Sequence, residues 1–472
     1  MGHRGFFFIL LLLLGGCAFH HPLEVVPPKE PPKSFYLAPE EVKTFFPERP
    51  WWLSFGDQRL NQLIEEAFRA NLDLKAGVAR IFKAKAILKE ALSFSLPSTS
   101  LEYSWRRSKE PGFFGENRGT SYRLSATASY ELDLWGRIRS SAKASLAELK
   151  ATQEDLRAFY LSLAAQVADA YYLLAALEQE KVRLNLLIKA VTEELTLVED
   201  LYLRGLVEAD ELLSVKTQFF ELTRQRTELQ EKISKTRHAL AILLGRYPEE
   251  APRPSLVKLP ALEQAFPLGL PSQIIMNRPD VQAAYWRVKA ADARVAAAIA
   301  ERFPRLNLLA SLGRSHTAFS IGDIVGSFWS LSLDSTLSLF EAGRKGARVE
   351  QEKAAALEAL YHYQQTVLRA FKEVEDALSA NLTAQKRLTE LDREESSLKT
   401  LLSLNLDRYH QGLGDYLSVL KTRVELLRTE QTKVQAQQAL ISARISLYRA
   451  LGGTWMEKYL KDSLMSQRGL DE

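Results

Sequence analysis

Apolar residues recur every seven positions between Arg137 and Arg204, a stretch that contains no Gly and no Pro. A second apolar row runs four positions out of phase with the first and is interrupted at Lys181. The first row consists of Leu149, Leu156, Leu163, Ala170, Leu177, Leu184, Val191 and Val198. Two rows with this spacing predict one long helix that packs in the manner of a coiled coil. Its length would be about 100 Å, whereas helices of globular proteins average about 11–12 residues.

The same succession of residues occurs twice along the chain. The matching pairs are Pro97 and Pro304, Gly136-Arg137 and Gly343-Arg344, Asp169-Ala170 and Asp376-Ala377, Gly205-Leu206 and Gly412-Leu413, and Leu244-Gly245 and Leu451-Gly452, each displaced by 207 residues. One offset shared by five matches predicts a duplicated, domain-sized unit. We therefore divide the body into a first repeat at 51–252 and a second at 253–455, followed by a C-terminal tail at 456–472 with Trp455 as its one strong anchor.

Each repeat is predicted to contain a helix, two strands, a long helix, a turn and a second helix. Gly and Pro residues delimit the helical stretches. The predicted helices span 58–96, 137–204 and 208–244 in the first repeat, and 280–303, 347–411 and 415–451 in the second. Gly77 is the weak point of the first helix, because Gly lowers helix stability by about 1 kcal/mol relative to Ala.

Apolar and polar residues alternate strictly in the segments between these helices. From Tyr122 to Leu134 every even position is Tyr, Leu or Ala, and every odd position is charged, Ser or Thr. Segments 101–106 and 329–339 alternate in the same way, and segment 306–312 does so except at Leu309. Period-two alternation predicts four β-strands of about ten residues. We expect the polar, Gly-rich segments 109–120 and 313–326 to be outward-facing loops.

Strands of this kind, with aromatic residues near their ends, fit a β-barrel in a membrane. Lipid satisfies no backbone hydrogen bonds, so such a sheet must close on itself. Known barrels have at least about eight strands, so the four strands of one chain cannot close one, whereas two chains bring eight and three bring twelve. The alternative is a pair of hairpins covering a soluble core. The predicted fold class is mixed, a long α-helical coiled-coil barrel with four membrane β-strands per chain.

The N-terminus has the features of an export signal. Phe6 to Leu14 is an unbroken apolar run, too short to span a bilayer but long enough for a signal-peptide core. Leu14-Gly15-Gly16-Cys17 resembles the lipobox of bacterial lipoproteins, in which the Cys is lipidated. We predict a signal peptide at 1–16 and a lipidated, Pro-rich tether at 17–50. The alternative is a chance Cys with cleavage elsewhere. In lipoproteins a residue such as Ala18, unlike Asp, suits the outer membrane.

Composition and charge narrow the function further. A formal charge of +4 on 472 residues does not favour nucleic acid binding. There is no phosphate-binding loop, and His238, His362 and His410 have no convincing ligand spacing, so we expect no enzyme activity, no metal and no cofactor. Asp169 and Asp376 occupy equivalent positions and could be paired acids, but polar positions on a tunnel wall explain them better.

Several motifs, weak singly but specific in their order, resemble the TolC-like outer-membrane factor family, and within it the lipoprotein branch that includes OprM. The resemblance covers roughly residues 51–455. The motifs are Phe55-Gly56-Asp57 with Leu60 and Leu63, Leu134-Trp135-Gly136-Arg137, Asn277-Arg278-Pro279-Asp280, Phe371-Lys372-Glu373-Val374-Glu375-Asp376-Ala377-Leu378 and Tyr409-His410-Gln411-Gly412-Leu413.

This resemblance implies a homotrimer with a twelve-stranded barrel in the outer membrane of a Gram-negative-type bacterium and a helical tunnel across the periplasm. Such proteins are passive exit ducts that work with an inner-membrane pump and a periplasmic adaptor, and they expel drugs, metals or proteins. Two alternatives stay open: a lipid-tethered periplasmic coiled-coil scaffold, and a duct for type I protein secretion.

The resemblance also points to the turns between the paired helices as the functional end. The family's adaptors dock near these turns, so the expected contact residues are Arg204, Gly205, Leu206, Gly412 and Leu413. The two glycines could also be helix caps only.

The narrow aperture is expected at the second turn, with Tyr409, Asp415, Ser418 and Lys421 as gating residues. Tyr409 matches the family's latch tyrosine. The family's aperture aspartates lie six and nine places after the turn glycine, where this chain has Ser418 and Lys421, so an acidic ring is in doubt.

Overall fold

The computed structural model describes residues 20–37, 49–112, 115–250, 259–260, 262, 271, 277–319 and 322–468. The chain divides into two compact units. Unit 1 comprises Met1–Lys29, Ala79–Glu154 and Gln282–Thr366, and unit 2 comprises Glu30–Val78, Asp155–Val281 and Val367–Glu472. Each unit takes segments from both halves of the sequence, so the compact units and the sequence repeats are two different divisions of the chain.

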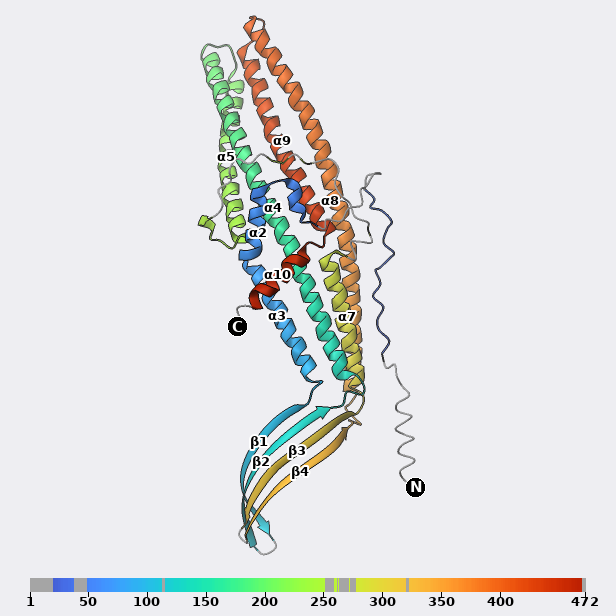
Figure 1. Cartoon of the computed structure of the whole chain (residues 1–472). Helices are drawn as coiled ribbons and strands as arrows, with labels where there is room; N and C mark the ends of the chain where they lie inside the picture. Colours follow the sequence, from blue (N-terminus) through green and yellow to red (C-terminus); the bar gives the residue numbers. More distant parts are fainter. Residues whose placement is uncertain are drawn as a thin grey trace. The chain divides into compact units, whose positions relative to one another are not determined.

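Unit 1 contains a four-stranded antiparallel sheet in the order β1-β2-β3-β4 (Figure 1). The strands are β1 (Ser98–Gly112), β2 (Gly115–Glu131), β3 (Arg305–Phe319) and β4 (Gly322–Thr336). The β2–β3 pairing joins the two halves of the sequence. The prediction of long loops at 109–120 and 313–326 is wrong, because pairing continues to Gly112 opposite Gly115 and to Phe319 opposite Gly322. Backbone hydrogen bonds do not depend on an apolar side chain, so the strands extend beyond the alternating segments.

The strand register gathers the apolar side chains on one face of the sheet, because residues directly opposite in paired strands share a face. Leu101 lies opposite Ala126, which lies opposite Leu312, which in turn lies opposite Trp329. The neighbouring row on the other face is Ser100, Thr127, Ser311 and Ser330. Leu309 falls on this polar face, which explains its break in the pattern. The apolar face is uncovered, with Leu101 74% and Trp329 80% exposed.

A corner formed by the predicted Leu134-to-Arg137 motif connects the sheet to a helix within unit 1. Trp135 Nε1 donates to the carbonyl oxygen of Pro304 at 2.7 Å, and its ring stacks on Phe303. The carboxylate of Asp133 accepts from the backbone N–H groups of Ile138 and Arg139, which caps the first turn of α4. Helix α4 spans Arg137–Leu203, and its counterpart α8 spans Arg344–His410. Helix α7 (Pro279–Ala300) precedes β3.

The predicted heptad row of α4 is its buried face. Leu156, Leu163, Leu184, Val191 and Val198 are each at most 3% exposed. One window of α4 is apolar enough to cross a membrane by composition, but 72% of that window is buried inside the protein. The apolar character of α4 therefore serves helix packing.

The predicted helix at 58–96 is two helices, α2 (Gln58–Ala70) and α3 (Leu72–Ser93). The break is at Asn71, whose side chain accepts from Leu74 N and donates to Leu243 O. Gly77 lies inside α3 instead, and a Cβ there would stand 2.8 Å from Leu156 Cδ1. Gly77 thus permits close packing of α3 on α4 and is not a helix break.

An aromatic cluster in unit 2 packs residues 51–55 against the C-terminal segment 455–460. The short 3-10 helix η1 (Trp51–Phe55) supplies three of its rings, and Tyr459 of helix α10 (Met456–Arg468) supplies another. Trp52 is 1% exposed and packs edge-on against Trp455 at 4.7 Å between ring centroids. Trp455 is not the only anchor of the tail, because Met456, Tyr459 and Leu460 of α10 pack there as well.

Arg278 is the second fixed point of unit 2 and lies in the predicted Asn277-to-Asp280 motif. Its guanidinium is 7% exposed and pairs with Asp280 at 2.6 Å and with Glu373 at 2.8 Å. It also donates to the carbonyl oxygen of Ala450 at the end of helix α9 (Tyr416–Leu451). Arg278 therefore ties the start of α7 to α8 and α9.

Candidate functional site

Two helix hairpins of unit 2, α4 with α5 (Ala209–Leu243) and α8 with α9, place their turns at the same end of that unit (Figure 1). Gly205 and Gly412 have φ of 71° and 70°, in the left-handed region that suits Gly. In each turn the Gly N–H donates to a carbonyl three residues back, and the following Leu N–H donates to one five residues back. Both turns are thus Schellman caps, so the glycines do have the capping role.

Apolar side chains are exposed at these turns. Leu206 is 66% and Leu413 is 74% exposed, and Leu203, just before the first turn, is 82% exposed. The Arg204 guanidinium pairs with Asp200 on its own helix at 2.9 Å, with both side chains open to solvent. Exposed apolar residues gathered at one end commonly mark a contact surface.

Ion pairs connect α9 to the other hairpin just behind the turns. Lys421 Nζ lies 2.7 Å from Glu211 Oε1 on α5, and Arg423 pairs with Glu193 on α4 at 2.9 Å. Further along, Glu430 of α9 pairs with Arg183 of α4 at 2.7 Å. Sequence reasoning proposed Lys421 but missed its partner and the other two pairs. No local spacing signals them, because each pair joins residues more than 200 positions apart.

The other predicted gating residues remain within the second hairpin. Asp415 caps α9 by accepting from Ser418 N at 2.7 Å and from the Ser418 hydroxyl at 3.0 Å. The Ser418 N–H holds the pKa of Asp415 below its ordinary value. The Tyr409 ring lies 5.2 Å from that of Tyr416. The structure therefore assigns Asp415 and Ser418 to the cap, whereas Lys421 reaches across to the other hairpin.

Glu194, next to Glu193 on α4, is buried with 3% exposure. Its Oε2 has no hydrogen-bond partner in the described part of the chain. Burial raises the pKa of Glu194, and the positive charges of Lys421 and Arg428 oppose this shift. A buried acid thus lies behind the ion pairs that link the hairpins, and the sequence pattern did not identify it.

Residues 20–37, which belong to the predicted Pro-rich tether, lie against helices. In unit 1, Asp292 of α7 accepts from Leu23 N at 2.9 Å and contacts His20 Nε2 at 2.8 Å, while Leu23 packs on Ala291 and Val295. In unit 2, Glu375 of α8 accepts from Tyr36 N and Leu37 N. Cys17 and the predicted signal peptide lie outside the described residues.

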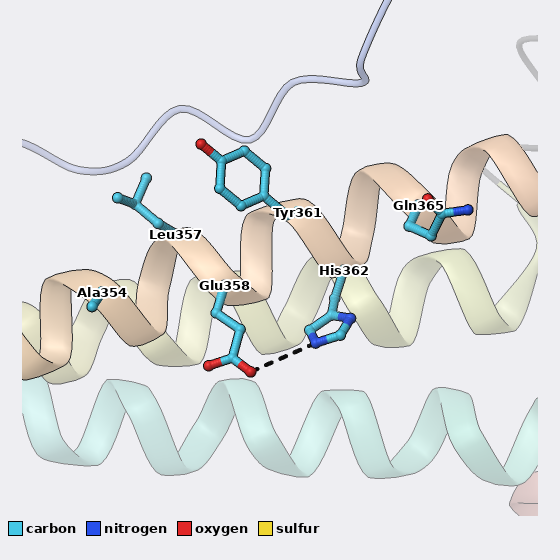
Figure 2. A pocket seen from close by; sticks show the side chains of 6 residues that line it. All are labelled: Ala354, Leu357, Glu358, Tyr361, His362 and Gln365. Atoms are coloured by element: carbon cyan, nitrogen blue, oxygen red, sulfur yellow. Dashed lines mark ion pairs between the residues drawn. The ribbon is translucent and has the colours of Figure 1, made fainter.

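One open hollow of about 550 Å³ lies on α8 within unit 1. Figure 2 shows Leu357 and Tyr361 on one side of the helix and Glu358 and His362 on the other. Glu358 and His362 are 3.7 Å apart and at least 73% exposed. A single helix supplies the whole lining, so this hollow has no convergent polar groups of the kind that small-molecule sites use. Among the described residues no group of three or more His, Cys, Asp or Glu could hold a metal ion.

Comparison with known proteins gives a consistent result. The model of a family described as outer membrane efflux protein matches residues 63–246 and 270–453, and the second range is the first displaced by 207 residues. The internal duplication is therefore confirmed.

Individual relatives and a solved structure cover most of the chain. It is 29% identical over 416 residues to the solvent efflux pump outer membrane protein SrpC of Pseudomonas putida, covering 85% of this chain and 86% of SrpC. It is 28% identical to the cation efflux system protein CusC of Escherichia coli O6:H1, covering 86% of this chain and 88% of CusC. The solved outer-membrane channel OprN is 30% identical, with a TM-score of 0.82 over 92% of this chain and 99% of OprN.

Proposed function

Because the chain belongs to the outer membrane efflux protein family and is an outer-membrane efflux channel, we propose that three copies form one passive duct served by an inner-membrane pump and a periplasmic adaptor. The observation that carries this proposal is the open sheet of unit 1. Among the described strands, the outer strands β1 and β4 each have one edge without a neighbour. Within lipid every backbone group needs a partner, so β4 of one copy is expected to pair with β1 of the next.

The bare apolar face supports the same assembly. Leu101, Leu312, Trp329 and Leu331 are each at least 64% exposed on one side of the sheet. A soluble monomer rarely exposes a continuous apolar face of this kind. Lipid is the natural environment for this face, and the opposite face, with its Ser and Thr rows, is expected to line the lumen.

Purified protein in detergent tests this proposal directly. We expect a trimer that resists dissociation by heating in detergent and conducts ions in planar bilayers. A protein that is monomeric and stable in water without detergent would overturn it. Such a result would favour the lipid-tethered scaffold, which exposes no membrane surface.

We assign adaptor contact to the turn residues Arg204, Gly205, Leu206, Gly412 and Leu413. The exposure of Leu206 and Leu413 supports this assignment, because docking would remove their apolar surface from water. Leu206→Asp with Leu413→Asp is expected to abolish export in cells while the trimer and its bilayer conductance persist. Loss of conductance, or retained export, would contradict a docking role.

The aperture is proposed to be held by the Lys421–Glu211 pair, which joins the two hairpins at 2.7 Å. Separation of α9 from α5 is then the opening movement. Lys421→Glu places two acids together and is expected to raise the open fraction about two- to fivefold, given the ~0.2–1 kcal/mol strength of partly exposed pairs. The exchange Lys421→Glu with Glu211→Lys restores the pair and should restore wild-type conductance. Failure of this double variant to reverse the single one would exclude the pair as the latch.

The cargo is proposed to be a small solute or ion. Relatives are named for export of solvents, pyoverdine and cations. Growth of an export-deficient host on such compounds, with and without this chain and a pump, tests the assignment. Export of a secreted protein alone would favour the type I secretion alternative.

A further inference from the structure

Two arginines interrupt the apolar face of the sheet near the hairpin ends of the strands. Arg314 of β3 lies opposite Leu124 and opposite Ser327, one row beyond the row that contains Leu312 and Trp329. Arg107 of β1 lies opposite Thr120, still closer to the hairpin. Both side chains are exposed. They share the face of Leu101 and Trp329 because directly opposite residues in a ladder lie on the same side.

Their height on the sheet places them at a membrane boundary. Below Arg314, towards the helices, this face of β3 carries Leu312, Ala310, Leu308 and Leu306. From Leu306 to Arg314 the rise along β3, at ~3.4 Å per residue and ~40° tilt, is about 21 Å of the bilayer normal. Outer-membrane barrels carry an apolar band of about 25 Å. Arg314 therefore lies at the upper edge of the band and Arg107 lies above it.

The residues around the arginines are those of a headgroup region. Trp105 and Tyr122 are directly opposite each other between Arg107 and the apolar band, as in the aromatic belts of membrane proteins. Lys109 continues the same face beyond Arg107. The nearby acid on this face, Asp323, is paired with His316 at 3.0 Å. Within the part of the chain that the structure describes, neither Arg107 nor Arg314 has an ion pair or hydrogen bond with another residue.

The polar face of the sheet offers a useful contrast. There Arg123 lies over the ring of Phe328, 5.3 Å from its centroid, and Phe328 in turn covers Gly313. Arg137, the first residue of α4, forms a bidentate pair with Glu131 at the end of β2. Arg123 and Arg137 thus have partners in the protein, whereas Arg107 and Arg314, and Arg106 on the polar face, have none among the described residues.

We propose that Arg107 and Arg314, with Lys109, form a basic patch that binds phosphate groups of phosphorylated glycolipids in the outer leaflet. This inference rests on the proposed barrel, since the barrel decides that the patch faces lipid. A guanidinium presents two parallel N–H donors to a phosphate, which suits arginine to such a headgroup. The acyl chains of the same lipid lie against Leu312, Leu101 and Trp329 below. An acidic soluble protein is a poorer occupant, because it offers nothing to this apolar band.

Lipid retention in detergent provides the test. Trimers are incubated with micelles containing diphosphorylated lipid A or phosphatidylcholine, separated by size exclusion, and analysed for bound lipid by mass spectrometry. Wild type is expected to retain lipid A over phosphatidylcholine, and 1 M salt is expected to reduce that retention. Arg107→Gln with Arg314→Gln should lower lipid A retention by about thirtyfold, in line with the ~1 kcal/mol that each basic residue contributes at an anionic surface. Excess inorganic phosphate should not displace the lipid if the whole headgroup and chains are recognised.

A matched control uses the opposite face of the same strands. Arg106→Gln with Arg123→Gln removes the same number of charges from the face assigned to the lumen and should leave lipid A retention unchanged. Equal retention by wild type and the Arg107/Arg314 variant, equal loss in the control, or no preference of wild type for lipid A would each overturn the inference. The conductance of the same samples is recorded in parallel. A conducting trimer without a preference for lipid A contradicts only this inference. A protein that neither assembles nor conducts contradicts the proposed duct.

Discussion

At the scale of single residues, buried charges hold the helices in place. Arg278 is the clearest case, because its guanidinium meets two carboxylates and one carbonyl while almost excluded from water. The sequence marked Arg278 as part of a motif, but it could not name Glu373 or Ala450 as its partners. Those contacts depend on how α7, α8 and α9 pack, which no local pattern encodes.

Replacement of Arg278 by Ala is expected to destabilise unit 2 by about 1–3 kcal/mol, because the buried carbonyl of Ala450 loses its donor. Thermal unfolding followed by circular dichroism measures this as a lower Tm. The matched control is Arg69→Ala, whose 80% exposed side chain pairs with Glu65 on the same helix. An exposed pair of this kind contributes about 0.3–0.5 kcal/mol. Equal effects of the two substitutions would show that Arg278 is not a structural centre.

Glu194 should make stability depend on pH. Burial raises its pKa above the ordinary value of 4.5, so the neutral form is favoured in the folded state. The contribution of Glu194 to the free energy of unfolding is therefore fully present below pH 4.5, where the side chain is neutral. It is lost as the pH rises through the folded-state pKa of Glu194. Glu194→Gln should therefore match wild type in acid and become progressively more stable than wild type towards pH 8. Denaturant unfolding between pH 4 and 8 checks this, with the half-exposed Glu199→Gln as control. A constant difference across this range would contradict the assignment.

At the scale of elements, sequence periodicity predicted the buried faces of helices and strands. It did not predict element boundaries that depend on contacts with distant residues. The seven-residue rows of α4 and the two-residue alternation of β2 were predicted correctly, because each reports a face buried in protein or lipid. Strand ends were not, because the backbone pairing of residues 109–112 does not require apolar side chains. The helix break at Asn71 was also missed, since its cause is a hydrogen bond to Leu243 at the far end of α5.

The facing of the sheet gives an element-scale prediction. Leu331→Arg on the apolar face should cost about 2–4 kcal/mol if the residue lies near the bilayer midplane. Ser330→Arg, on the adjacent residue of β4 and the opposite face, should cost little. Urea unfolding from lipid vesicles measures both. If Ser330→Arg lowers the free energy of unfolding more than Leu331→Arg does, the Ser330 face of the sheet is the one in contact with lipid, contrary to the assignment.

At the scale of the whole molecule, the duplication and the family were predictable because equivalent residues recur at one offset. The Lys421–Glu211 ion pair was not, because α9 pairs differently from its counterpart. Lys421 meets Glu211 of the other hairpin, whereas the equivalent position in α5 is Ser214, which cannot form an ion pair. The two repeats differ in sequence where α9 contacts α5, and such a difference cannot be recognised from the repeat offset. The predicted repeat boundaries and the lipid anchor remain predictions.

We expect Cys17→Ser to remove the acyl chains while the channel still folds. Mass spectrometry of the wild type should show the added lipid on Cys17, and the variant should lack it. Residues 20–29 contact α7 and α8 independently of any lipid, so trimer yield should change little. An unmodified wild type would contradict the lipoprotein prediction.

The open edges of the sheet also have a genetic consequence. In the proposed trimer each copy closes the ring with one strand edge from each half of the sequence, so a chain with a proline-disrupted β1 can still offer its intact β4 to a neighbour. Such a chain would enter the barrel and leave an unpaired β1 edge that a wild-type copy cannot close. With equal expression of both alleles, roughly one ring in eight would be free of the faulty chain. A loss-of-function substitution in β1 should therefore be dominant when it is expressed together with the wild-type chain.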